Sequence, residues 1–278
     1  MLRWGIGWLV LLGVITACSD QPEIKGSLLI IGGGDRTPAI VQKALTEAHI
    51  TDQDYIVILP MAGEEPDTSF EYMAKDFRPF THAHLVNLNF SDSARNRSAM
   101  VDSLRHAKLI MICGGDQRVF MQVVRGNEIE QAMWEAYRNG GLIAGTSAGA
   151  AVMSAVMITG DQKRDTVYSV TYPVVEKDNA VYEQGLGFIQ EGIIDQHFIV
   201  RSRYNRLFTA MADHPGLWGM GIDEATAVWI HDHRAEVVGE SQVVWVERKS
   251  EWNWIGAKAG TSNLELSIQL PQEVWELE

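Results

Sequence analysis

A serine flanked by glycines is the feature of this sequence best suited to chemistry. Residues 145–149 read Gly-Thr-Ser-Ala-Gly, a G-x-S-x-G pattern that follows a short apolar run and precedes an alanine-rich stretch. Between a strand and a helix this pattern is a nucleophile elbow, in which glycines permit a tight turn. The helix dipole and free backbone N–H groups would favour negative charge beside Ser147. A turn that binds phosphate or only reverses the chain is the alternative.

A serine nucleophile needs a base and a group that orients the base. His197 follows an apolar, strand-like run, and Asp223 and Glu224 end another short apolar segment. Taken alone, the histidine could be structural and the acidic pair could form an ordinary turn. The order serine, histidine, acid argues against the α/β-hydrolase fold, in which the acid precedes the histidine.

Two other glycine-rich segments follow predicted strands. Residues 114–117 read Gly-Gly-Asp-Gln, at the strand end where open α/β sheets bind ligands. The backbone N–H of Gly115 could there form an oxyanion hole with that of Ala148. Residues 32–34 are three glycines without the G-x-G-x-x-G spacing of a dinucleotide site. Because no cysteine and histidine cluster has zinc spacing, we expect neither a metal nor a cofactor.

Together these motifs resemble the cyanophycinase family of serine peptidases, which is related to aspartyl dipeptidase. The resemblance runs from about residue 27 to about residue 230. It is carried by residues 114–117, 145–149, 195–198 and 221–225, with Arg201, Arg203 and Arg206 following His197. It implies a fold similar to class I glutamine amidotransferases. It further implies that Ser147 is the nucleophile, His197 the general base and Glu224 the acid that orients it.

The resemblance also implies a pocket for a peptide or a dipeptide polymer. Cyanophycin is a poly-aspartate whose side-chain carboxyls carry arginine, so its enzyme must hold carboxylates and a guanidinium. The family's pattern assigns the first task to Arg201, Arg203 and Arg206, which could grip carboxylates with two bonds each. It assigns the second task, or contact with the aspartyl backbone, to Gln117, Asp195 and Gln196. A solvated helix face is the alternative for the three arginines.

Strand-like and helix-like segments alternate along the first half of the chain. The predicted strands cover residues 27–31, 55–59, 84–88, 109–113 and 142–144, and the predicted helices cover residues 36–49, 67–77, 94–106, 119–138 and 148–157. This rhythm predicts a three-layer α/β/α sandwich with a mostly parallel sheet. Residues 159–187 interrupt it with loops and short strands.

The C-terminal part has a different pattern. Residues 235–247 alternate as two strands around Gly239-Glu240, which predicts a hairpin. We expect a β-rich segment from about residue 231, within a single peptidase domain that spans residues 27–278.

The N-terminus has the pattern of an export signal. Arg3 precedes an apolar stretch that is too short to span a membrane stably, so residues 1–17 are expected to be a signal peptide. Residues 15–18 read Ile-Thr-Ala-Cys, which resembles a bacterial lipobox and implies lipidation of Cys18, with residues 18–26 as a lipidated tether. An ordinary signal peptide with a chance cysteine is the alternative. We expect a lipid anchor in the bacterial cell envelope, in the outer membrane facing the periplasm if the cell is diderm.

Composition limits the partners. The net charge of −13 argues against nucleic acid, which demands basic patches, while a homodimer is compatible with the sequence. With Cys18 acylated, Cys113 is the one remaining thiol, so no disulfide can form within the chain.

The sequence favours an exported serine exopeptidase that hydrolyses aspartyl or β-aspartyl bonds, with cyanophycin-like substrates first. An aspartyl dipeptidase or other isopeptide hydrolase, and a catalytically inactive lipid-anchored binding protein, stay open.

Overall fold

The computed structural model describes residues 24–92, 96–164, 167 and 169–277. The predicted signal peptide, Cys18 and the first part of the predicted tether lie outside the described residues. Among the residues that are described, no helix combines the length and the apolar character needed to cross a membrane.

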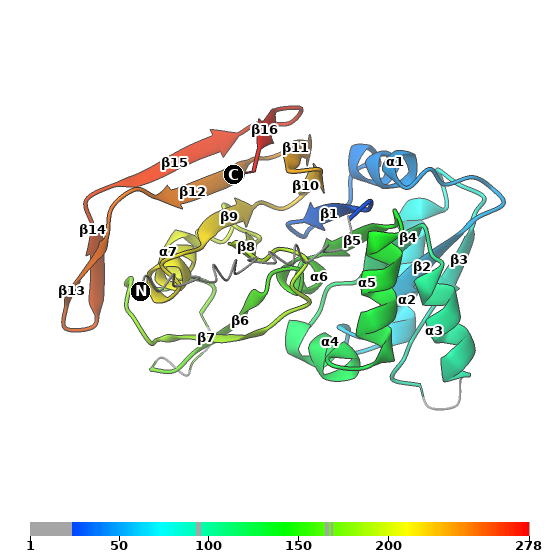
Figure 1. The fold of residues 1–278 in the computed structure, drawn as a ribbon, viewed down its shortest axis with the longest axis horizontal. Coiled ribbons are helices and arrows are strands. Elements are labelled where there is room, and N and C mark those ends of the chain that lie inside the picture. The colour runs from blue at the N-terminus through cyan, green and yellow to red at the C-terminus, as the bar shows by residue number, and fades with distance from the viewer. Residues whose placement is uncertain (1–23, 93–95, 165–166, 168, 278) are drawn as a thin grey trace, which may run out of the picture.

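A large mixed sheet forms the centre of the protein, in the strand order β16-β11-β10-β1-β5-β4-β2-β3 (Figure 1). The parallel strands are β1 (Ser27–Ile31), β5 (Leu142–Thr146), β4 (Leu109–Ile112), β2 (Tyr55–Leu59) and β3 (His84–Asn87). The antiparallel strands are β10 (Thr226–His231), β11 (Arg234–Gly239) and β16 (Val274–Glu276). The inner parallel strands are mostly apolar because both of their faces are covered.

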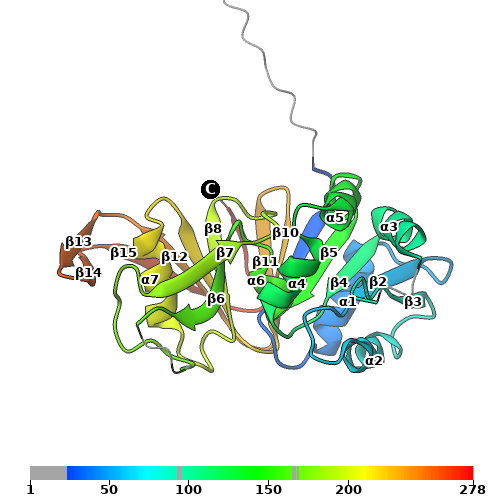
Figure 2. The same cartoon turned by 90° about the horizontal axis from the view of Figure 1, so that it is seen from below.

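Helices cover the two faces of the parallel strands, as Figure 2 shows. On one face lie α1 (Pro38–Glu47) and α2 (Pro66–Phe77), and on the other lie α3 (Arg97–Arg105), α4 (Gln117–Val124), α5 (Glu128–Arg138) and α6 (Ala148–Ala151). Neighbouring residues of β1 enter the two cores alternately: Leu29 and Ile31 pack with α1 and α2, and Leu28 and Ile30 pack with the other helices. This confirms the predicted three-layer sandwich with a mostly parallel sheet.

A second sheet follows in the chain, with the order β15-β12-β9-β8. Its strands are β8 (Gly192–Gln196), β9 (Trp218–Ile222), β12 (Val243–Arg248) and β15 (Leu264–Gln269), and only β8 and β9 are parallel among them. Helix α7 (Tyr204–Asp213) packs on one face through Leu207 and Met211, while Met220 and Ile222 join the core of the large sheet. The second sheet therefore places β8 and β9, the strands before and after α7, next to the large sheet.

Two pairs of antiparallel strands complete the described chain. They are β6 (Val156–Gln162) with β7 (Ala180–Gln184), and β13 (Trp252–Ile255) with β14 (Lys258–Thr261). Figure 1 shows β13 and β14 at the end of the molecule farthest from α2 and α3. The predicted β-rich character of the C-terminal segment is confirmed.

Two predicted helices are wrong in extent. The helix expected over residues 119–138 is interrupted, because Gly126 has a φ of +71° and Asn127 caps α5 by accepting a hydrogen bond from Ile129 N. The helix expected over residues 148–157 ends at Ala151. The next residues pair instead with the segment before β8: Ala155 N donates to Ile189 O at 2.8 Å.

The predicted hairpin around Gly239-Glu240 is also wrong. Strand β11 pairs with β10 and β16, whereas β12 pairs with β9 and β15, so the two strands belong to different sheets. The hairpin turn lies earlier, at Asp232 and His233, whose φ values of 47° and 62° are typical of a type I′ turn. Gly239 marks the passage between the sheets, since a Cβ there would lie 2.2 Å from Ala225 O.

Candidate active site

Ser147 occupies a tight turn between β5 and α6. Its φ of 54° and ψ of −109° lie outside the regions that side chains favour, a strain that is common at functional sites. A Cβ on Gly145 would lie 2.3 Å from Gly149 O, and one on Gly149 would lie 2.5 Å from Ile112 O. Both glycines are therefore required by close backbone contacts, as a nucleophile elbow demands.

Ser147, His197 and Glu224 lie in one chain of hydrogen bonds. Ser147 Oγ is 2.8 Å from His197 Nε2, and His197 Nδ1 is 2.6 Å from Glu224 Oε1. His197 directly follows β8, and Glu224 lies in the turn between β9 and β10. An imidazole held between a hydroxyl and a carboxylate at these distances can accept the hydroxyl proton while the carboxylate stabilises its charged form.

The three glycines after β1 make room for the histidine and the glutamate. Gly32 O accepts from His197 N at 2.7 Å. A Cβ on Gly33 would lie 2.2 Å from His197 Cε1, and a Cβ on Gly34 would lie 2.9 Å from Glu224 Cβ. Sequence reasoning missed this role and only excluded a dinucleotide site. The available signal was that these glycines end the strand beside the one that ends at the serine.

The surroundings of His197 lower its pKa below the ordinary value of 6.5. Burial is the largest cause, because it penalises the charged imidazolium. The hydrogen bond to Glu224 acts in the opposite direction, and the positive charges of Arg201 and Arg203 lower the pKa further. The net result favours the neutral imidazole, which is the form that can act as a base at neutral pH.

Asp223, the other half of the acidic pair, has a structural task. Its Oδ1 accepts from Ile199 N at 3.1 Å and from Val200 N at 2.9 Å, and its Oδ2 accepts from Ser241 Oγ at 2.7 Å. These bonds hold the backbone that follows His197 against the end of β9. The two acids therefore have different tasks: Asp223 holds a loop in place, and Glu224 forms a hydrogen bond with the imidazole.

A cavity of about 610 Å³ opens over the serine. It is lined by Gly115, Gln117, Ser147, Gln196, His197, Arg201, Arg203 and Arg206, together with residues 62–64, 116, 118, 119 and 159–161. Gly115 has a φ of +140°, and a Cβ there would lie 1.9 Å from Ala62 O. Ala148 is the first residue of α6, so its N–H has no partner within the helix.

Two of the three predicted substrate-binding arginines are buried in the wall of this cavity. Arg206 Nε donates to Asp195 Oδ2 at 2.8 Å, and Arg203 Nη1 donates to Gln196 O at 2.7 Å. Both arginines also donate to Gln196 Oε1. These bonds fix the two guanidinium groups before any ligand arrives.

The remaining predicted pocket residues differ in their exposure to the cavity. Arg201 is partly exposed, with Nη2 3.7 Å from Glu224 Oε1. Gln117 Nε2 donates to Ile158 O and Thr159 O at 2.9 and 2.7 Å. The carboxylate of Asp195 is fully buried and does not line the cavity. Its placement supports a role in holding Arg206 and gives no support to the expected direct contact with a ligand.

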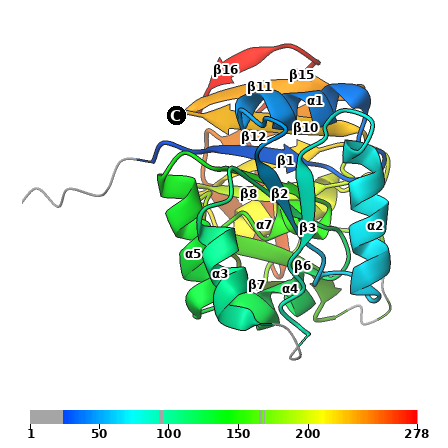
Figure 3. The same cartoon turned by 90° about the vertical axis from the view of Figure 1, so that its right-hand side faces the viewer.

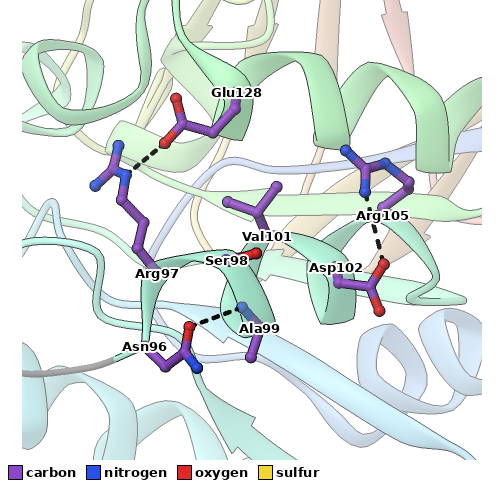
Figure 4. A pocket seen from close by; sticks show the side chains of 8 residues that line it. All are labelled: Asn96, Arg97, Ser98, Ala99, Val101, Asp102, Arg105 and Glu128. Carbon is purple, nitrogen blue, oxygen red and sulfur yellow. Dashed lines mark hydrogen bonds and ion pairs between the residues drawn. The ribbon is translucent and has the colours of Figure 1, made fainter.

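A larger cavity, of about 820 Å³, lies elsewhere on the surface, along α3 and the start of α5 (Figure 4). Its arginines are engaged in ion pairs: Arg97 Nε is 2.5 Å from Glu128 Oε1, and Arg105 Nη1 is 3.6 Å from Asp102 Oδ1. It contains none of the three hydrogen-bonded residues. Within the described ranges, no group of three histidine, cysteine or acidic residues could hold a metal ion.

Comparisons with known sequences identify relatives across most of the chain. The model of peptidase family S51 matches residues 28–238. A cyanophycinase from Nostoc sp. is 32% identical over 229 residues, which cover 80% of this chain and 74% of that protein. A cyanophycinase from Geminocystis herdmanii is 30% identical over 230 residues, which cover 81% of each chain.

Solved structures share the fold. The crystal structure of a peptidase from an acI-B1 Actinobacterium matches with a TM-score of 0.65 and 19% identity, covering 92% of this chain and 99% of that one. A protein from Listeria monocytogenes described as a peptidase E matches with a TM-score of 0.56 and 15% identity, covering 78% and 99%. At these identities the likeness concerns the fold alone.

Proposed function

The chain belongs to peptidase family S51, and we propose that it is an exported serine-type exopeptidase that hydrolyses aspartyl or β-aspartyl peptide bonds. One observation carries the proposal: the continuous contact from Ser147 through His197 to Glu224, at 2.8 and 2.6 Å, beside a cavity lined by arginines. A family member that had lost catalysis would have no reason to keep this geometry.

The proposed mechanism has two halves. Ser147 Oγ attacks the substrate carbonyl while His197 Nε2 takes its proton, and Glu224 stabilises the imidazolium that forms. The N–H groups of Gly115 and Ala148 stabilise the oxyanion. His197 then returns the proton to the leaving amine. A water molecule, deprotonated by the same imidazole, then attacks the ester carbonyl, and Ser147 Oγ leaves with the proton that His197 returns to it.

The cavity walls support an acidic substrate. Arg201, Arg203 and Arg206 present three guanidinium groups near the nucleophile, and such groups bind carboxylates with paired, charge-assisted hydrogen bonds. Asp116 and Asp161 line the same cavity but are ion-paired with Arg118 at 2.8 and 2.5 Å. Glu64, which also lines it, is therefore the acid that supports a substrate with a cation. A unit of aspartate joined through its side chain to arginine has both charges. The names of the cyanophycinase relatives point to the same class of substrate.

The N-terminal sequence supports the location. The charged and apolar residues 1–17, followed by Cys18, support export, lipid attachment at Cys18 and anchoring in the cell envelope. Cyanophycin is ordinarily a cytoplasmic store, so an exported enzyme would act on polymer released by other cells, or on another aspartyl peptide. An aspartyl dipeptidase on the same catalytic residues is the second candidate, because the arginine wall would bind an aspartyl carboxylate in either case.

A substrate panel tests the proposal. The purified full-length protein and its Ser147→Ala variant are incubated with cyanophycin and with dipeptides that begin with aspartate, and the products are identified by mass spectrometry. Release of aspartate–arginine units by the wild type alone supports the first candidate, and cleavage of dipeptides alone supports the second. If the wild type cleaves none of these substrates, the proposed function is wrong, and fluorophosphonate labelling of Ser147 then separates another hydrolase from an inactive binding protein.

A further inference from the structure

A second, smaller cavity also reaches the nucleophile. It has a volume of about 210 Å³ and is lined by Gly33, Arg36, Tyr72, Cys113 and Ser147, among others. Ser147 is the one residue that lines both this cavity and the cavity of about 610 Å³. We call the smaller one the Arg36 cavity. A substrate that spans the attacked bond needs space on both sides of the serine, and the two cavities both border Ser147.

The lining residues assign a side of the attacked bond to each cavity. Gly115, the proposed oxyanion donor, lines the larger cavity, which also contains the arginines that follow His197. Gly33 lines the Arg36 cavity and lies directly against the edge of the His197 ring that carries Cε1 and Nε2. His197 itself lines the larger cavity and not the Arg36 cavity, so the arginines assign the sides. The arginines proposed to bind the aspartyl carboxylate of the acyl part line the larger cavity, which leaves the Arg36 cavity for the residue on the other side of the attacked bond.

Arg36 gives this cavity a specific chemistry. Its side chain is only 6% exposed, its Nε is 2.5 Å from Asp76 Oδ2, and its Nη1 donates to Gly34 O at 3.1 Å. The guanidinium lies over the Tyr72 ring, 4.7 Å from the centroid. A guanidinium has five N–H donors, and these bonds use two of them. The others can donate to a carboxylate.

The rest of the lining does not oppose an anion. Burial raises the pKa of the Cys113 thiol to about 12, so the thiol stays uncharged at neutral pH. Met73 and the ring of Tyr72 supply apolar surface. The volume is below the roughly 300 Å³ at which pockets for drug-sized ligands begin, so the cavity suits one residue and not an extended peptide.

We propose that the Arg36 cavity is the subsite for the residue released as the amine, and that Arg36 binds the free α-carboxylate of that residue. The inference rests on the proposed function and deepens it, because it predicts removal of a residue from the carboxyl end of a substrate. Arg36 acts in specificity, through binding, and takes no part in proton transfer.

The subsite can be tested in the reverse direction, by letting an added amine compete with water for the acyl-enzyme. The wild type is acylated with aspartate α-4-nitroanilide, and glycine or glycinamide is added as a competing nucleophile. The amine attacks the ester carbonyl, Ser147 Oγ leaves with the proton returned by His197, and a dipeptide or its amide forms in place of free aspartate. The ratio of the two aminolysis products compares an acceptor with a carboxylate and one without.

Arg36→Lys should lower the ratio of glycine to glycinamide products by roughly tenfold, because lysine keeps a charge beside Asp76 but lacks the two-bond fork. Comparing ratios between variants cancels the different basicities of the two amines. Tyr72→Ala removes the ring under the guanidinium and is a second route if Arg36→Lys does not fold, since Tyr72 is about half exposed. It should lower the ratio in the same direction.

Arg78→Gln is the matched control. Arg78 caps the same helix, α2, and pairs with the exposed Glu71, so its replacement should leave the ratio unchanged. A wild-type ratio in both Arg36→Lys and Tyr72→Ala would overturn the subsite. Intact-mass detection of acylated Ser147 separates the two failures. If the acyl-enzyme forms and the ratio is unchanged in the variants, only the subsite proposal is wrong. If no acyl-enzyme forms, the proposed function is wrong as well.

Discussion

Replacing Gly33 with alanine should move His197, the proposed catalytic base. The new Cβ would lie 2.2 Å from Cε1 and 2.5 Å from Nε2 of His197, whereas non-bonded carbons approach to about 3.5 Å. The ring must therefore shift by roughly 1 Å, a misplacement that can cost about 10²-fold in rate. The φ of +109° at this position adds about 1–3 kcal/mol of backbone strain. We expect kcat to fall by about 10²-fold or more, together with a lower Tm.

The assay is kcat on the best aspartyl substrate, with Tm measured on the same preparations. Gly126→Ala is the control, because Gly126 also has a positive φ, of 71°, but open space around the position of a Cβ. It should lose stability and keep kcat within about twofold, since no catalytic group is displaced. If Gly33→Ala is folded and retains kcat within about threefold of wild type, Gly33 is not needed to make room for His197.

Three further predictions follow from the charges and thiols. Arg201→Gln removes a positive charge that lowers the pKa of His197, so the acidic limb of kcat/KM, which reports protonation of the base, should move to higher pH; a pH profile with an unmoved or lower limb would contradict this. Cys113→Ser should leave kcat within about threefold, because the thiol is buried, protonated and not the attacking group; loss of serine acylation in a folded variant would count against the assignment. Cys18→Ala should abolish incorporation of radiolabelled palmitate, and equal labelling of variant and wild type would exclude the lipid anchor.

The strands of the large sheet and the turn at Ser147 could be predicted because their signals are local. Continuous apolar runs identify strands buried on both faces, and the glycines around Ser147 are close to it in sequence. Helix ends were harder to predict. The end of α6 at Ala151 depends on pairing with the segment near Ile189, a contact that the alanine-rich sequence does not contain.

Strand partners were the main error in the fold. The alternation over residues 235–247 correctly indicates two extended segments, but a period of two residues says nothing about which strands pair. The apparent hairpin is a crossing from one sheet to another, made possible at Gly239 by its φ of +124°. The true turn, at Asp232 and His233, has no glycine to signal its positive φ values.

In the site, as in the sheets, the sequence did not reveal which residues are partners. The resemblance to a family supplied the roles of Ser147, His197 and Glu224, but not the contacts of the pocket residues around them. Asp195 is neutralised by Arg206, and Asp223 is occupied by backbone N–H groups, contacts that only the folded chain reveals. Gly33 and the Arg36 cavity were missed because β1 and the segment after β8 meet only through tertiary structure.

Labelling with a fluorophosphonate, read by intact mass and peptide mapping, is the most direct test of whether Ser147 is the nucleophile. We expect one adduct per wild-type chain, on the peptide that contains Ser147, and no adduct on Ser147→Ala, whose kcat should fall by roughly 10³ to 10⁶. Glu224→Gln should label more slowly, because the imidazole loses the group that orients it. Labelling at another residue, or wild-type turnover by Ser147→Ala, would show that Ser147 is not the nucleophile.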